Sequence, residues 1–419
     1  MRFLFIAPFV MLSCVSAAAA QPSAAATSSS DLRLVVVITR HGVRSPTDPT
    51  ELTPYAAKPW PVWEVPPGNL TLHGATLMTM MGASYRAHYA AAGLLPSSGC
   101  PAADSVYVWA DIDQRTKATA TALLDGLAPN CGLASHDNGS AEDPLFDPLP
   151  QIAKADPATA SASVLGSVGE DPQALLAANA DSFARLDAIL GCGAAACRRM
   201  SSVPIALESS RATGLAGLGG ALDLAGTAVE DFILAYADGK PLSEVGWGAV
   251  DHATLLELTR LRSLRFTLTN EAPYISRARG SNLLAHTLAT IDQAATGARD
   301  EKTRVPAAAR FVAFVGHDST LGALAGILRL HWLMPGYQLN DTPPGGALVF
   351  ELHRSADGAG PFVRLFYAAQ SLDQMRTLSK EPPQRVAVFV PGCPSFDCPV
   401  GTFDRIVNAA IDPAFVGPW

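Results

Sequence analysis

The sequence predicts an α/β protein: a central mixed β-sheet flanked by helices, with an inserted, mainly α-helical domain. Three apolar segments of strand length lie near residues 35–39, 105–110 and 311–315, and the second and third lead into helical patterns. Between them, residues 131–270 are rich in alanine, leucine and glycine and contain few strand-forming residues. Strands and helices at both ends of the chain, separated by a helical middle, favour this fold class.

Length and composition indicate a large globular protein. The 419 residues are 48% apolar and 16% charged, and they are too many for one core. We therefore predict an α/β domain formed by residues 31–130 and 271–419, with an inserted helical domain at 131–270. The formal charge is −8, which does not suit non-specific nucleic-acid binding. An anionic ligand must then be attracted by a local cluster of positive charge.

The first twenty residues have the pattern of a secretory signal. Arg2 precedes an apolar run from Phe3 to Val15, and small residues continue to Ala20. We expect cleavage near Ala20 and a periplasmic or secreted protein, whereas a lipoprotein attached through Cys14 fits the preceding residues less well. After this segment no apolar run is long enough to span a bilayer, so no membrane span is expected.

Six cysteines remain once Cys14 leaves with the signal. They allow 15 connectivities, and their spacing suggests neighbouring pairs: Cys100–Cys131, Cys192–Cys197 and Cys393–Cys398. Two of these pairs have a C-x4-C spacing that also suits zinc. Disulfides are the better interpretation in an exported protein.

A phosphate-binding loop is predicted where the first strand ends, in RHGVRSPT (40–47). A phosphate monoester carries up to two negative charges, which repel a nucleophile until they are neutralised. Arg40 and Arg44 can hold the phosphoryl oxygens with bidentate hydrogen bonds. His41, between them, can attack phosphorus as a neutral imidazole. The alternative is an arginine-rich strand end that pairs with surface carboxylates.

A third arginine follows the second strand, in SVYVWADIDQRTKATATALLDGL (105–127). The strand ends near Ala110, and a helix begins near Asp111 or Asp113, which places Arg115 in its first turn. That position suits an anion because free N–H groups and the helix dipole point the same way. Taken alone, Arg115 would more often be a surface ion-pair residue.

A His-Asp pair follows the third strand, in RFVAFVGHDST (310–320). Gly316 turns the chain so that His317 and Asp318 stand at the carboxyl end of a buried strand, and a helix is expected from Thr320. Taken alone, such a pair is usually structural.

The remaining segments predict further elements. These are a proline- and tryptophan-rich loop at 50–68, helices at 71–90, 171–190, 209–238 and from 251, a hairpin of 341–354 with 361–376 whose loop contains Asp357 and Gly358, and a strand at 385–390. Trp60 and Trp63 in the loop could shape a substrate rim or cover the core, and the second interpretation is favoured.

Together these motifs resemble the histidine acid phosphatases, the RHGxRxP branch of the histidine phosphatase superfamily. Five fixed positions of that signature are expected by chance in on the order of one in 10⁴ chains of this length. ADIDQRT and GHD are similar to two further segments of the family. The resemblance runs from about residue 31 to 415, is weakest in the helical insert, and is closest to bacterial periplasmic phytases and glucose-1-phosphatases. It implies that the insert roofs the site.

The resemblance also implies a role for each candidate residue. His41 would form a phosphohistidine, and Asp318 would protonate the leaving alkoxide and later accept a proton from water. The phosphoryl oxygens would be held by Arg40, Arg44, Arg115 and His317. No metal or other cofactor is required because three arginines replace it. A carboxyl group as general acid predicts best turnover at acidic pH.

Departures from the family pattern bear on the substrate. Phytase-like members often carry a lysine shortly after the RHGxRxPT run, where this chain has Asp48. The His-Asp pair is followed by Ser319 and Thr320, which match neither the HDTN of phytase-like members nor the HDSN of glucose-1-phosphatase-like ones. We favour a phytase-like acid phosphomonoesterase acting on inositol phosphates, and a glucose-1-phosphatase or broad sugar-phosphate phosphatase as the alternative. The expected partner is one small-molecule phosphate monoester, and the expected state is a monomer.

Two other classes are less favoured. A phosphoglycerate-mutase-like transferase would tend to have glutamate or a small polar residue after RHG and would be cytoplasmic. A phospho-ligand binding protein that has lost catalysis would not need both His41 and Asp318.

Overall fold

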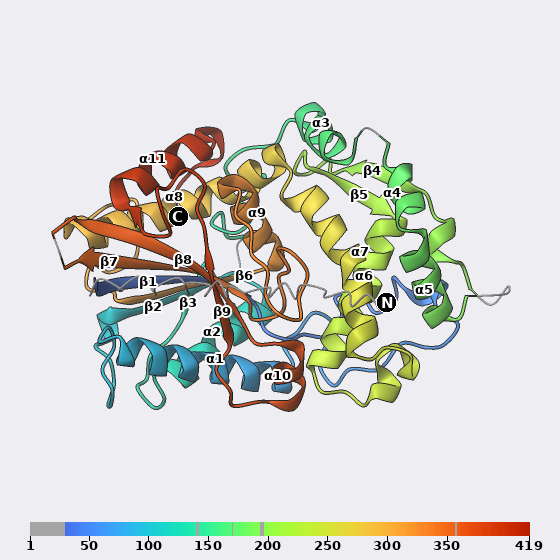
Figure 1. Cartoon of the computed structure of the whole chain (residues 1–419), viewed down its shortest axis with the longest axis horizontal. Coiled ribbons are helices and arrows are strands. Elements are labelled where there is room, and N and C mark those ends of the chain that lie inside the picture. Colours follow the sequence, from blue (N-terminus) through green and yellow to red (C-terminus); the bar gives the residue numbers. More distant parts are fainter. Residues whose placement is uncertain (1–29, 140–141, 170, 193–196, 357) are drawn as a thin grey trace, which may run out of the picture.

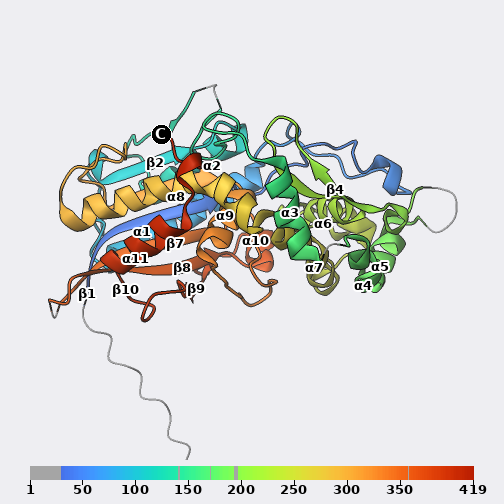
Figure 2. The same cartoon turned by 90° about the horizontal axis from the view of Figure 1, so that it is seen from above.

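The computed structural model describes residues 30–139, 142–169, 171–192, 197–356 and 358–419. The predicted signal segment, with Cys14 and Ala20, lies outside these residues. Two halves lie side by side along the long axis of the molecule (Figures 1 and 2). One half contains a β-sheet between layers of helices, and the other is mainly helical.

The sheet is mixed, as predicted, and has eight strands in the described part of the chain. They are β1 (Ser30–Arg40), β2 (Val106–Ala110), β3 (His136–Asp137), β6 (Phe311–Gly316), β7 (Ala347–Ser355), β8 (Pro361–Ala369), β9 (Gln384–Val388) and β10 (Cys398–Pro399). The order is β10-β8-β7-β1-β6-β2-β3, and β9 also pairs with β8. The pairs β1–β6, β6–β2 and β2–β3 are parallel, and the others are antiparallel. The parallel strands matter for function because their carboxyl ends meet at one edge.

Helices cover both faces of the sheet (Figure 1). They are α1 (Leu72–Ala91) and α2 (Gln114–Leu127) on one face, and α8 (Pro273–Thr296), α9 (Asp318–Leu328) and α11 (Val400–Ala410) on the other, with α10 (Leu372–Thr377) at the sheet's end. Val35 and Val37 of β1 pack into the core beneath α1 and α2, whereas Val36 and Ile38 pack into the core on the opposite face. This alternation buries both faces of β1.

The other half holds α3 (Pro157–Val168), α4 (Gln173–Ala178), α5 (Ala180–Leu190), β4 (Ile205–Ser209), β5 (Ala216–Gly220), α6 (Ala221–Ala237) and α7 (His252–Asn270). The predicted domain boundaries at 130/131 and 270/271 stay a prediction. Strand β3 lies inside the predicted insert yet extends the main sheet through β2.

Two predicted helices differ from the structure. The helix expected at 209–238 is wrong in its first half, where β4 and β5 form an antiparallel hairpin before α6 begins at Ala221. The physical reason is glycine: Gly214 and Gly220 have φ of +79° and +75°, outside the right-handed helical region. The helix expected at 171–190 is broken at Asn179 into α4 and α5.

The remaining expectations are confirmed with small shifts. Helix α9 begins at Asp318, two residues before the predicted Thr320. Strands β7 and β8 form the predicted hairpin, but its second strand ends at Ala369, and Leu372–Thr377 of the segment expected to reach residue 376 form α10. Asp357 in the hairpin loop lies outside the described residues. The loop at 50–68 contains only a short 3-10 turn, and Trp60 stacks on Phe232 with ring centroids 5.5 Å apart, as a core-covering residue would.

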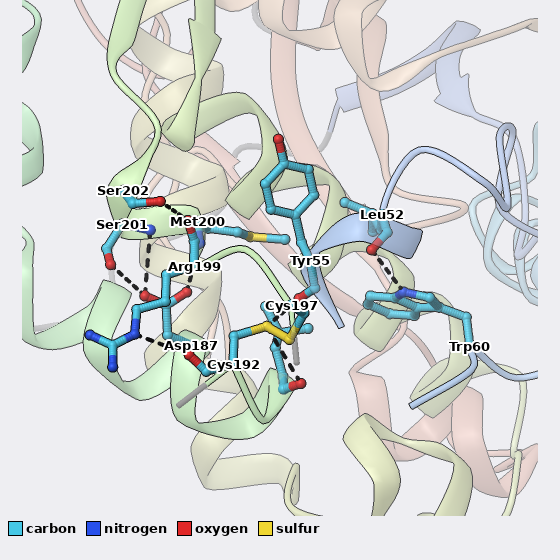
Figure 3. Close-up of a disulfide and its surroundings, with 11 residues drawn as sticks. Leu52, Tyr55, Trp60, Asp187, Cys192, Cys197, Arg199, Met200, Ser201 and Ser202 are labelled. Carbon is cyan, nitrogen blue, oxygen red and sulfur yellow. Dashed lines mark hydrogen bonds between the residues drawn. A yellow bond between two sulfur atoms is a disulfide. The ribbon is translucent and has the colours of Figure 1, made fainter. Parts of the chain in front are cut away.

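All three predicted disulfides are present: Cys100–Cys131, Cys192–Cys197 and Cys393–Cys398. Figure 3 shows the second of these beside the 50–68 loop, where Cys192 Sγ lies 3.1 Å from the Tyr55 carbonyl oxygen. The same region is tied down by Asp187, whose Oδ1 accepts a hydrogen bond from the Met200 N–H at 2.8 Å. Among the described residues, no helix has the length and apolar character needed to cross a bilayer.

Candidate active site

Three strand ends bring the predicted site residues together. Arg40 at the end of β1 pairs with Gly316 at the end of β6, and Val315 of β6 pairs with Ala110 at the end of β2. Because these strands are parallel neighbours, the loops that follow them leave the same edge of the sheet. Segments more than 200 residues apart in the sequence therefore meet there. This edge faces α6 and α7 of the other half (Figure 1). All six predicted residues end or follow these three strands within five residues.

The motif loop after β1 is fixed by backbone contacts. The His41 N–H donates to the Gly316 carbonyl at 2.9 Å, and the His41 carbonyl accepts from the Gly345 N–H at 2.9 Å. The loop also packs closely on α1, because a Cβ added at Gly74 would lie 2.2 Å from the Val43 carbonyl oxygen. Gly42 is confined in the same way, since a Cβ there would lie 2.8 Å from Met78 Cγ. Close packing, which the sequence did not indicate, is thus a reason for the glycine in RHG.

His41 has the form of a nucleophile. Only 3% of its surface is exposed, and its Nδ1 lies 2.8 Å from the Gly42 carbonyl oxygen. A proton on Nδ1 donates to that oxygen, which leaves the lone pair on Nε2 free. Burial, followed by the positive charges of Arg40 and Arg44, holds the pKa of His41 well below its usual value. The ring is therefore neutral over the whole physiological range.

Three arginines surround His41, and each has a guanidinium N–H donor that the described residues leave without a partner. Arg40 donates from Nη1 to the Thr342 carbonyl at 2.7 Å, and Arg44 donates from Nη1 to the Ser45 carbonyl at 2.8 Å. Arg115 pairs through Nη2 with Asp113 at 2.6 Å. The Nε atoms of all three are buried and have no hydrogen-bond partner in the described part of the chain. Buried guanidinium donors without a partner are costly unless an anion satisfies them.

His317 stands opposite His41, with ring centroids 5.6 Å apart. Its Nε2 lies 2.6 Å from Asp111 Oδ2, and its Nδ1 lies 3.4 Å from Arg115 Nη2. Asp111 is buried and fixes the ring orientation. Asp111, Asp113 and His317 place possible metal ligands within 4.8 Å of one another. Arg115 already pairs with Asp113, and His317 is held by Asp111.

A buried charge network from the helical half completes the site, and the sequence did not reveal it. Glu230 of α6 bridges two arginines, Arg40 and Arg262, with a distance of 2.6 Å to Arg262 Nε. Arg262 of α7 also reaches Asp318 Oδ2 at 3.0 Å and Asp341 Oδ1 at 3.2 Å. Arg40 Nη2 lies 3.7 Å from the same Asp318 oxygen. The predicted general acid is thus an ion-paired carboxylate in this state.

These contacts determine the protonation of Asp318 and Glu230. Burial alone would raise the pKa of Asp318, but Arg40 and Arg262 outweigh burial and hold it well below its usual value. Burial likewise opposes ionisation of Glu230, and Arg262 and Arg40 nevertheless lower its pKa to about 2. Both carboxylates are ionised near neutral pH.

With this geometry in place, the chain can be compared with known proteins. Residues 31–368 match the family model of the histidine phosphatase superfamily, branch 2. The chain belongs to this family. It is 33% identical to Phytase AppA of Escherichia coli (strain K12), over 94% of this chain and 95% of that protein. It is 29% identical to the glucose-1-phosphatase of Salmonella typhimurium, over 90% of this chain and 92% of that protein.

A solved structure shows the same fold. The phytase of Hafnia alvei, in complex with tartrate, superposes with a TM-score of 0.86 at 33% identity, covering 93% of this chain and 99% of that chain. As a member of this family, the chain is a histidine acid phosphatase with a phytase-like α/β fold.

The motifs did not indicate a further arginine of this phosphatase. Arg279 of α8 has a buried Nε without a partner among the described residues, and burial lowers its pKa while Asp147 and Asp318 oppose that shift. Glu230 and Arg262 are charged residues buried within α6 and α7, and Arg279 is a partly buried one in α8. A charged residue on the apolar side of the α6 or α7 pattern was the available clue.

Proposed function

We propose that this chain hydrolyses phosphate monoesters through a phosphohistidine at His41, as a phytase-like acid phosphatase. One observation carries the proposal: a buried, neutral His41 stands among three arginines whose buried Nε donors lack partners in the described residues. A neutral imidazole can attack phosphorus, and guanidinium groups neutralise the phosphoryl oxygens. Buried guanidinium donors without a partner are unfavourable until a ligand satisfies them.

The first half-reaction transfers the phosphoryl group. Nε2 of His41 attacks phosphorus in line, the ester P–O bond breaks, and the departing oxygen takes a proton from Asp318. The non-bridging oxygens are held by Arg40, Arg44, Arg115 and His317. The Asp111 carboxylate, 2.6 Å from His317 Nε2, fixes the orientation of the His317 ring beside the phosphoryl group.

Asp318 must gain a proton before it can donate one. The bound phosphate adds negative charge beside Asp318 and competes with it for Arg40, and both effects raise its pKa. Acidic solution supplies the proton. In the second half-reaction, water attacks the phosphohistidine, Asp318 accepts the water proton, and phosphate leaves.

Two substrate classes follow from the relatives: inositol phosphates, from the phytases, and sugar phosphates, from the glucose-1-phosphatase. Asp48 lies at the rim of the site, where its Oδ1 accepts hydrogen bonds from the Thr50 N–H and hydroxyl at 2.8 and 2.6 Å. These bonds lower its pKa, so the rim is negatively charged at acidic pH. An acidic rim favours esters with fewer phosphates.

The place of action is proposed to be the periplasm or the exterior of the cell. The signal-like first twenty residues support this, and so do three disulfides, which persist in oxidising compartments.

The test is phosphate release at about pH 5 from p-nitrophenyl phosphate, inositol hexakisphosphate and glucose 1-phosphate, with His41→Ala as the blank. We expect release from p-nitrophenyl phosphate and from at least one natural ester. The ranking of the other two assigns the substrate class. Release no faster than the blank from all three would refute catalysis and favour a binding protein.

A further inference from the structure

A cavity of about 140 Å³ adjoins Arg44 on the side facing the helical half. Its walls come from the end of the motif loop, from α6 and α7, and from Asp318 at the start of α9. It is lined by Arg44, Pro46, Thr47, Asp48, Glu51, Gly226, Thr227, Glu230, Asp231, Arg262, Arg265, Phe266 and Asp318. Since Arg44 and Asp318 border it, the leaving group of a bound ester must lie in or beside this cavity.

Carboxylates outnumber cations in its lining. Arg262 is already balanced by Glu230, Asp318 and Asp341. Arg265 is balanced by Asp223, with which it forms an ion pair. Arg44 is the remaining cation, and the proposed phosphate site needs it. Across the described residues, the lining carboxylates with no ion pair are Asp48, Glu51 and Asp231.

Asp231 is the member of this group that points to a ligand. Only 8% of its surface is exposed, yet it makes no hydrogen bond or ion pair within the described segments. It lines the cavity, and its other side borders a smaller cavity that contains Glu244. Enclosure of most of the side chain makes its ionisation unfavourable, so a cation or donor bound in the cavity would relieve that cost.

We propose that Asp231, with Glu51 and Asp48 at the rim, forms a leaving-group subsite that binds the ammonium group of a phosphate monoester. The substrates are small amino alcohol or amino sugar phosphates. The inference rests on the proposed phosphatase activity, because it assigns the neighbouring half of the same substrate. A second phosphate in this position would instead meet three carboxyl groups.

Protonation of Asp231 gives the subsite a distinctive pH dependence. Burial raises the pKa of Asp231 to about 8, with Glu230 and Glu51 adding to the rise and Arg44 opposing it. Asp48, Arg262, Arg265 and Asp318 also face the cavity, and Glu244 borders Asp231 from the other side. An ammonium group binds the ionised carboxylate, so the preference for it strengthens as the pH rises toward that value. A neutral leaving group gains nothing from this ionisation.

The experiment compares kcat/KM for matched esters in the full-length enzyme between pH 5 and 8. The pairs are O-phosphorylethanolamine with propyl phosphate, and glucosamine 6-phosphate with glucose 6-phosphate. Each pair differs in the ammonium group, and the two pairs place it at different distances from phosphorus. We expect the amino-to-neutral ratio in at least one pair to exceed one and to rise with pH.

Asp231→Asn should lower that ratio on the order of tenfold at pH 7 and remove its pH dependence, as expected for loss of one charge-assisted hydrogen bond. Asp292→Asn is the matched control. The pKa of Asp292 is also raised, to about 6, but Asp292 lies on α8 outside the cavity lining, and its replacement should leave the ratio unchanged. A ratio at or below one in both pairs, or one that Asp231→Asn does not alter, would overturn the proposal.

Calorimetric titration of His41→Ala with the amino and neutral esters of both pairs tests the ammonium subsite separately from the phosphatase activity, because binding can be measured without turnover. Failure to hydrolyse p-nitrophenyl phosphate would refute the proposed activity alone. Tighter binding of the amino ester, lost in His41→Ala/Asp231→Asn, would still support the subsite. Equal binding of the two esters in each pair would refute it.

Discussion

The two sides of the active site are built in different ways. One side comes from the carboxyl ends of β1, β2 and β6, and carries the nucleophile with Arg40, Arg44 and Arg115, whose Nε donors have no partner among the described residues. The other side comes from α6 and α7, and carries Glu230, Asp231 and Arg262. The strand side presents positive charge to a ligand, whereas the helix side presents mainly carboxylates.

The two sides therefore have different roles in the reaction. Strand ends hold their side chains rigidly, which suits the in-line geometry of phosphoryl transfer. The helices contact the strand side through Arg40 and Asp318, so they can change protonation and leaving-group preference without moving the nucleophile. Changes on the strand side should therefore affect the chemical step itself, and changes on the helix side should affect pH dependence, stability and selectivity.

The largest effect is expected from Asp318→Asn on the strand side. An amide cannot donate the proton that an alkoxide leaving group needs, so kcat should fall about 10²- to 10⁴-fold for glucose 1-phosphate. The loss should be much smaller for p-nitrophenyl phosphate, whose leaving group departs without a proton. Steady-state rates on both esters check this, and an equal loss on both would show that Asp318 is not the acid.

Arg262→Gln tests the helix side next. It leaves Glu230, Asp318 and Asp341 with one counter-charge fewer, and breaking a buried ion pair typically costs about 3–5 kcal/mol of unfolding free energy. Because Arg262 lowers the pKa of Asp318, its loss raises that pKa. Asp318 then keeps its proton to higher pH, and the alkaline limb of the kcat profile should move upward.

The control for this variant is Arg265→Gln, on the same helix. Arg265 lines the same cavity but pairs with Asp223, not with Asp318. Denaturation curves and pH profiles of the two variants should differ. An alkaline limb that moves equally in both, or in neither, would mean that Arg262 does not influence the acid.

Asp231→Asn, on the helix side, should change how the free energy of unfolding depends on pH. The pKa of Asp231 is raised from 3.8 to about 8 in the folded protein, so the folded state binds the proton more tightly than the unfolded state. Asp231 therefore costs the wild type stability as pH rises between these values, by about 1.4 kcal/mol per pH unit. The variant should gain on the wild type at that rate in urea denaturation series at pH 5, 6 and 7. A constant difference between the two proteins would contradict the raised pKa.

The smallest effect is expected from Asp48→Lys at the exposed rim. Exchanging a negative for a positive charge in solvent typically contributes less than about 1 kcal/mol per interaction. The relative rate on inositol hexakisphosphate should rise about two- to fivefold over p-nitrophenyl phosphate, and the gain should shrink at high salt. An unchanged ratio would show that the rim does not contact the additional phosphates.

The same division explains what the sequence could predict. The strand-side residues follow apolar runs of recognisable length, and parallel pairing then brings Arg40, Arg115 and His317 to one edge. Glu230 and Arg262 lie 32 residues apart on two helices. The helical period gives the buried face of each helix, but it does not predict that these two side chains pair with each other beside Arg40. The misplaced helix at 209–238 has a related cause, since Leu215 and Leu218 fit a helical spacing that the positive φ of Gly214 and Gly220 forbids.

The most direct test of the central claim is to trap the phosphoenzyme. Rapid mixing with ³²P-labelled p-nitrophenyl phosphate, a quench that preserves phosphohistidine, and peptide mapping would locate the label in wild type, Asp318→Asn and His41→Ala. We expect phosphate on Nε2 of His41, a larger labelled fraction in Asp318→Asn because hydrolysis of the intermediate lacks its base, and no label in His41→Ala. Turnover without label, or label on another residue, would contradict the central claim.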